Sequence, residues 1–282
     1  MNLGKTIQIY MPDGSPTSIK IAEVTTRIVQ LILIPRNKLT EMNLREEVKS
    51  VGVYFLFGKS DTDGKPSVYI GEAENCFDRL RQHNRDVNKD FWNVAVVAVS
   101  KTSSFTKSHV KYLESFFYKE AMKIGRYKLA NGNIPTQSSL PEPMVADLMD
   151  NFETIKTLLS ALGYPIFEKL ISDEAKEIFY CKGKDALAKG EYTNEGFVVL
   201  KDSVCNLVES ATAGNWIANM RRELKENGVL VEEGNVLKFV EDHIFSSPSA
   251  AAGTVLARRA NGWTEWRDVA GNTLDQLKRQ GE

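Results

Sequence analysis

Four residues between positions 54 and 83 combine two phenols, a guanidinium and an imidazole: Tyr54, Tyr69, Arg79 and His83. A phenol or an imidazole can transfer a proton, and a guanidinium binds anions through paired hydrogen bonds. Tyrosines are also ordinary strand residues, so the two phenols alone are equally consistent with packing. The arginine and the histidine shift the balance towards a functional site.

Two short strands are expected to position the phenols. Apolar side chains alternate with other residues over 52–57 and again over 67–71, and a turn-forming run over 61–64 separates the two segments. The pattern predicts an antiparallel hairpin. Because successive strand side chains point to opposite faces, Tyr54 and Tyr69 should share one face. The opposite face should carry Val53, Phe55, Phe57, Val68 and Ile70.

A short polar helix is expected after the hairpin. Gly71 lets the chain leave the strand, Asn75 is a plausible N-cap, and Asp78 falls in the first turn. Arg79 and His83 are four residues apart and should therefore share one face of this helix.

A second candidate group, Glu114, lies on a long helix predicted over 107–124, after a buried strand over 92–99. The apolar stripe of that helix is Val110, Leu113, Phe117, Ala121 and Ile124, and Glu114 falls on its flank. Burying an unpaired carboxylate costs free energy, so Glu114 should meet a cation. Position alone leaves two candidates open, a divalent metal and a neighbouring Lys or Arg.

The triplets Gly52-Val53-Tyr54 and Tyr69-Ile70-Gly71, followed by Arg79, resemble the signature of the GIY-YIG nuclease family. Val53 stands where the family has isoleucine, which keeps a β-branched residue. The resemblance implies an α+β fold in which helices flank a small antiparallel three-stranded sheet. It also implies a metal-binding carboxylate and a later asparagine.

The resemblance implies a role for each residue. Tyr54 would be the general base for a water or would orient it, although a free phenol titrates near ~10 and needs a nearby cation to act at neutral pH. Tyr69 would hydrogen-bond in the same network. Arg79 would bind the scissile phosphate, and His83 would assist proton transfer, unless it is a structural histidine.

The remaining implied roles fall on later residues. Glu114 would hold one Mg²⁺ or Mn²⁺ on the phosphate. Asn133 would position Glu114 or the phosphate, with Asn131 as the second choice, although Asn131-Gly132 is also an ordinary turn dipeptide.

Breaks in composition predict four segments. A preface of strands and a helix covers 1–50, and the nuclease domain covers 51–135. A linker and connecting helix occupy 136–165, and a second α+β domain that binds substrate or a partner covers 166–282.

The C-terminal segment has its own motif, S-P-S-A-A-A over 247–252 and N-G-W-x-x-W over 261–266. It resembles an uncharacterised domain often joined to GIY-YIG domains. Arg258 and Arg259 lie between the two parts and could contact DNA, while tryptophans in a small domain are more often core.

Composition excludes several classes. The chain has 282 residues, 42% hydrophobic and 26% charged, with a net charge of −1, so any DNA binding must come from local patches. Three separated cysteines without C-x-x-C argue against zinc or disulfides. The sequence shows no apolar run of membrane length, signal segment or phosphate-cradling glycine loop. We therefore expect a cytoplasmic protein without membrane or nucleotide-cofactor binding.

These observations favour a metal-dependent endonuclease that cleaves DNA, in restriction or phage defence or in repair. The alternative is a catalytically inactive nucleic-acid-binding or scaffold protein on the same fold. The sequence leaves open whether the protein forms a homodimer.

Overall fold

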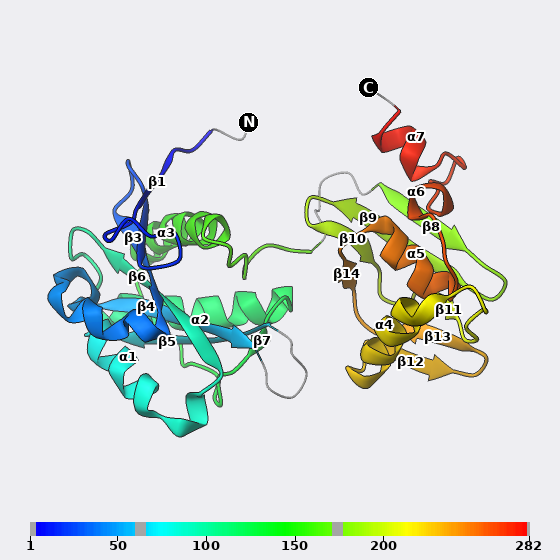
Figure 1. The fold of residues 1–282 in the computed structure, drawn as a ribbon. Helices are drawn as coiled ribbons and strands as arrows, with labels where there is room; N and C mark the ends of the chain where they lie inside the picture. The colour runs from blue at the N-terminus through cyan, green and yellow to red at the C-terminus, as the bar shows by residue number, and fades with distance from the viewer. Residues whose placement is uncertain (1–3, 60–65, 171–176, 281–282) are drawn as a thin grey trace. The chain divides into compact units, whose positions relative to one another are not determined.

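The computed structural model describes residues 4–59, 66–170 and 177–280, so the turn expected over 61–64 lies outside the described residues. The chain divides into two compact units, Met1–Glu168 and Lys169–Glu282. Each unit contains a mixed sheet-and-helix core, so the fold is α+β (Figure 1).

The sheet of the first unit has the strand order β1-β2-β3-β6-β4-β5-β7. Its strands are β1 (Ile7–Tyr10), β2 (Lys20–Val24), β3 (Val29–Pro35), β4 (Gly52–Lys59), β5 (Pro66–Ala73), β6 (Trp92–Ser100) and β7 (Lys128–Leu129). The described sheet therefore has seven strands rather than the expected three. Three of the additional strands follow from the second edge of β6, which pairs with β3 from Val29↔Ser100 to Pro35↔Val94, and the fourth, β7, pairs with β5.

Helices cover both faces of this sheet. On one face, α2 (Lys107–Ile124) and α3 (Glu142–Ala161) pack on the side chains of Val53, Phe55 and Phe57. On the other face, α1 (Cys76–Arg85) and the 3₁₀ helices η1 (Arg36–Leu44) and η2 (Glu46–Lys49) cover Tyr54 and Leu56. The period of two thus separates the side chains as predicted, but both faces are core. A third 3₁₀ turn, η3 (Val87–Lys89), precedes β6.

The helix expected in the N-terminal preface is replaced by the two 3₁₀ segments. Arg45, between them, has an extended backbone at φ −110° and ψ 112°, which interrupts any continuous α-helix. The segment 136–165 also does more than connect, since α3 contributes Leu148, Phe152 and Ile155 to the core of the first unit.

The second unit contains a second sheet with the order β12-β13-β11-β9-β10-β14, and β8 pairs with β9. Its elements are β8 (Ile178–Lys182), β9 (Leu187–Thr193), β10 (Gly196–Val199), β11 (Val204–Asn206), α4 (Gly214–Glu226), β12 (Leu230–Glu233), β13 (Val236–Phe239), β14 (His243–Phe245), α5 (Pro248–Leu256), α6 (Gly262–Glu265) and α7 (Leu274–Lys278).

The S-P-S-A-A-A and N-G-W motifs form the centre of this second core. Ser247 caps α5 by accepting the N–H of Ala250 at 3.1 Å. The indole of Trp266 is fully buried, packs on Phe197 with centroids 4.3 Å apart and ring planes tilted by 34°, and donates Nε1–H to the carbonyl of Pro248 at 3.0 Å. The motif therefore builds the core of the second unit.

Candidate active site

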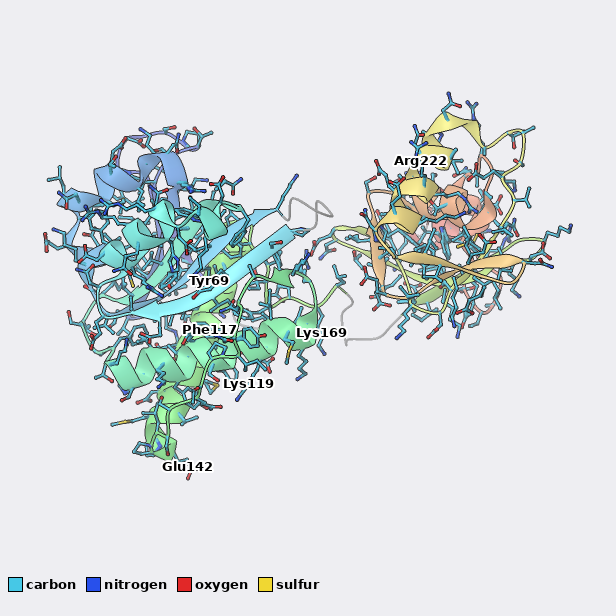
Figure 2. The ribbon with its side chains drawn as sticks, turned by 90° about the horizontal axis from the view of Figure 1, so that it is seen from below. Tyr69, Phe117, Lys119, Glu142, Lys169 and Arg222 are labelled. Atoms are coloured by element: carbon cyan, nitrogen blue, oxygen red, sulfur yellow. The ribbon has the colours of Figure 1, made fainter. Side chains whose placement is uncertain are left out.

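The hairpin of β4 and β5 places the two phenols on one face of the sheet. In its register, Tyr54 lies opposite Gly71 and Leu56 lies opposite Tyr69. The ring of Tyr54 lies over Gly71, where an added Cβ would be 2.3 Å from the Tyr54 hydroxyl. Glycine is therefore required at position 71 because the phenol occupies the space of any side chain. Figure 2 shows Tyr69 on β5 and Phe117 on α2, which covers the other face.

Helix α1 brings Arg79 and His83 to the phenols. Asn75 caps this helix by accepting the N–H of Asp78 at 3.1 Å. The Tyr54 hydroxyl is hydrogen-bonded to His83 Nε2 at 2.8 Å, and Arg79 Nε donates to the same hydroxyl at 3.4 Å. The ring of Tyr69 lies 6.2 Å from that of Tyr54 and 5.2 Å from that of His83, centroid to centroid. Four residues singled out from the sequence thus form one contact network.

Burial sets the protonation of this network. Tyr54 is only 1% exposed, and burial raises the pKa of its phenol well above the ordinary value, while the hydrogen bond from Arg79 opposes that rise. Burial, together with the positive charges of Lys89 and Arg79, lowers the pKa of His83 to about 4, against the opposing charge of Asp86. At neutral pH both partners of the 2.8 Å bond are therefore uncharged, and the imidazole is able to accept a proton.

Glu114 lies half-buried on α2 beside the end of the hairpin. Its carboxylate accepts a hydrogen bond from the backbone N–H of Glu72, and its charge also raises the pKa of Tyr54. Burial, then the charge of Glu72, raises the pKa of Glu114 to about 7, against the opposing charges of Lys107 and Lys111. Glu114 is therefore near enough to the phenols for its charge to act on Tyr54.

The two cation candidates left open for Glu114 can now be compared. The ammonium of Lys107 is bonded to Glu72 at 2.8 Å, and among the described residues no Lys or Arg forms an ion pair with Glu114. Within the same residues, no group of three or more His, Cys, Asp or Glu side chains is close enough to enclose a metal. A single carboxylate with a second one nearby suits Mg²⁺ or Mn²⁺, which keep several waters and take further oxygens from a phosphate.

The two asparagine candidates differ in position. Asn133 is exposed, whereas Asn131 is half-buried on the outer edge of β5. The carboxamide of Asn131 accepts the N–H of Ile70 at 3.1 Å and donates to its carbonyl at 2.7 Å. It thus pairs like a peptide unit of a neighbouring strand and fixes the backbone between Tyr69 and Gly71. An Asn-Gly dipeptide carries no signal of this pairing, because the turn pattern looks the same either way.

Sequence reasoning missed two charged side chains of the site, Glu72 and Lys89. Glu72 follows Gly71 on β5, where its backbone N–H and its charge both act on Glu114 and its carboxylate pairs with Lys107 at 2.8 Å. Lys89 lies outside the helix and strand patterns, at the end of η3, with Nζ 3.7 Å from the ring centroid of Tyr69. No periodicity could have predicted that contact.

In the second unit, most of the residues expected to touch DNA are engaged internally. Arg258 donates to Glu265 at 2.8 Å, and the ring of Trp263 packs between Tyr192 and the guanidinium of Arg279. Arg259 is exposed. The exposed tryptophan of this unit is Trp216 on α4, with 45% of its surface accessible.

The profile of a domain of unknown function, DUF4357, matches residues 179–278. This segment lies within the second unit. Comparison with curated proteins and with solved structures finds no match. Within the described residues, no helix is both long enough and apolar enough to cross a membrane.

Proposed function

We propose that the first unit is a metal-dependent endonuclease of the GIY-YIG type that hydrolyses phosphodiester bonds in DNA. One observation carries the proposal: Tyr54, Tyr69, Arg79 and His83, which come from three different elements, meet in one network beside Glu114. A buried phenol needs one hydrogen-bond partner, and Tyr54 has two, an imidazole and a guanidinium.

The geometry supports a proton relay. Hydrolysis forms a bond between a water oxygen and phosphorus and breaks the bond from phosphorus to the leaving oxygen. As Tyr54 takes a proton from the water, it passes its own hydroxyl proton along the 2.8 Å bond to His83 Nε2. The leaving oxygen takes a proton from solvent. The raised pKa of Tyr54 makes a free phenolate unfavourable, so the relay removes the need for one.

Two positively charged groups would stabilise the negative charge on the phosphate. Arg79 is partly exposed, and its guanidinium has donors besides the Nε that contacts Tyr54, so it can bind phosphate oxygens. When bound at Glu114, a divalent metal supplies positive charge to the same phosphate. Without such a cation, the raised pKa of Glu114 leaves much of this carboxyl protonated at neutral pH.

Incubation of the full chain with plasmid DNA tests the proposal. We expect nicks or breaks with Mg²⁺ or Mn²⁺, none with EDTA, and none from Glu114→Gln with the metal present. Full activity of Glu114→Gln would remove the metal mechanism. Metal-independent binding of DNA without any cleavage would favour the alternative, an inactive nucleic-acid-binding protein.

We further propose that the second unit holds the substrate or a partner, through the surface that carries Arg259 and Trp216. Both side chains flank Gly214 at the start of α4: a Cβ at Gly214 would lie 3.8 Å from the guanidinium and 3.9 Å from the indole. Arg259→Ala should weaken DNA binding by the full chain and reduce its salt dependence, whereas Arg258→Ala should not. Whether the pathway is restriction, phage defence or repair rests on the DNA that is cleaved.

A further inference from the structure

Lys89 is fixed beside the tyrosines by the loop that carries it. The backbone N–H of Lys89 bonds to the carbonyl of Asp86 at 3.0 Å. Arg36 braces the same loop, because its guanidinium donates to Asn84 and to Asp90, each at 2.8 Å, and to the carbonyl of Trp92 at 3.1 Å. The loop therefore holds the half-buried ammonium of Lys89 against the outer face of Tyr69.

Lys89 and Arg79 form a pair of like charges. Each lowers the pKa of His83, and Arg79 also lowers the pKa of Lys89. Neither cation forms an ion pair with a described carboxylate: Arg79 donates to Tyr54 and Gln82, and Lys89 lies over the ring of Tyr69. The carboxylate of Asp86 is near enough for its charge to raise the pKa of both Lys89 and His83, against the effect of the two cations. Two neighbouring cations repel each other, and the single carboxylate of Asp86 leaves a net positive charge, so an anion that binds between them stabilises the pair.

We propose that Lys89 and Arg79 together bind one phosphate group of a polynucleotide, with Lys89 contacting the phosphate directly. The inference rests on the proposed function for the identity of the anion, yet binding can be measured without cleavage. If Lys89 served only to pack on the ring of Tyr69, one cation would be enough for that contact. Such a role would not explain why Lys89 lies near Arg79 and His83.

The pair would also couple binding to the proton relay. A bound phosphate offsets the two positive charges that lower the pKa of His83, so the pKa of the imidazole rises when substrate is present. His83 then becomes a better acceptor for the Tyr54 proton only after the phosphate has entered.

Titration with thymidine 3′,5′-bisphosphate, without metal, tests the pair in the full chain. The imidazole signal of His83 in NMR spectra should show a pKa near 4 in the free protein and a higher value with the probe. Lys89→Met keeps most of the aliphatic stem and removes the charge, and it should weaken probe binding about tenfold to a hundredfold. Lys89→Arg should retain most of the affinity. Arg81→Gln, on the same helix as Arg79 but paired with Asp78, is the control and should bind normally.

The outcomes separate this inference from the proposed function. Normal probe affinity in Lys89→Met would overturn the paired-cation site and assign Lys89 to packing, even if the wild type cleaves DNA. Weakened probe binding in Lys89→Met would support the site, even if the wild type cleaves nothing. If Lys89→Met melts below the wild type, Lys89→Gln with an unchanged melting temperature gives the same decision.

Discussion

The hairpin with α1 in the first unit and the α5 segment with α4 in the second unit both combine glycine, aromatic and arginine residues, but their arginines have different partners. In the second unit, Arg221 is fully buried and donates to the carbonyls of Thr254, Asn206 and Leu207. Beside the hairpin, Arg79 on α1 and Lys89 on η3 form no ion pair with a described carboxylate, and the charge of Arg79 lowers the pKa of Lys89. The comparison teaches that a motif with satisfied polar groups builds a core, whereas one with unpaired charges is arranged for a ligand.

The largest expected effect on stability is in the α5 segment of the second unit, where the polar groups are hydrogen-bonded. Trp266→Ala removes a fully buried indole and its hydrogen bond to Pro248, and it should lower the free energy of unfolding of the second unit by about 3–5 kcal/mol. Denaturant unfolding followed by circular dichroism measures the loss. A cost below about 1 kcal/mol would show that this motif is not a core.

A smaller loss is expected from Gly71→Ala in the hairpin. The added methyl group would meet the Tyr54 ring, so the phenol must shift away from His83. We expect a cost of about 1–3 kcal/mol in unfolding free energy and a loss of cleavage larger than that cost explains. Unchanged cleavage would show that the position of Tyr54 does not matter.

The stability difference between Glu114→Gln and the wild type should depend on pH. Since the folded pKa of Glu114, about 7, lies above its ordinary 4.5, the folded protein gains stability from protonated Glu114 below about pH 4.5 and loses it as pH rises through 7. Without metal, the free energy of unfolding of Glu114→Gln should therefore rise relative to that of the wild type between pH 5 and pH 8. After a discount for partial exposure, we expect a relative rise of about 1–2 kcal/mol. Loss of stability at pH 8 would instead indicate a structural ion pair.

The smallest effect should separate the two asparagines. Asn131→Ala removes two hydrogen bonds to Ile70 and should cost about 1 kcal/mol, with some loss of cleavage. Asn133→Ala changes an exposed side chain and should alter neither stability nor cleavage. Equal effects of the two substitutions on thermal melting would show that the hydrogen bonds of Asn131 to Ile70 do not stabilise the fold.

Local patterns predicted the parts of the site that depend on local geometry. The period of two placed Tyr54 opposite to Phe55, the spacing of four placed Arg79 and His83 together, and Asn75 caps α1 as its type predicted. These features require only a strand and a helix of known period.

Long-range pairings were beyond the sequence patterns. The pairing of β3 with β6, the bonds of Asn131 to Ile70 and the contact of Lys89 with Tyr69 each join segments far apart in the chain. In the second unit, the tryptophans of the motif are packed while Trp216 is exposed, because helix packing rather than composition decides which aromatic residue is covered.

The most direct test of the central claim compares Arg79→Ala with Arg81→Ala in the full chain, by plasmid nicking with Mn²⁺ and by thermal melting. Both arginines lie on α1 and are exposed, but Arg79 contacts Tyr54, while Arg81 lies near Asp78 and the ring of Phe77. We predict that Arg79→Ala loses at least about a hundredfold in rate, as removal of a group that stabilises transition-state charge does, with its melting temperature retained. Arg81→Ala should cleave like the wild type. Equal cleavage by the two variants would contradict the assignment of this network as a nuclease site.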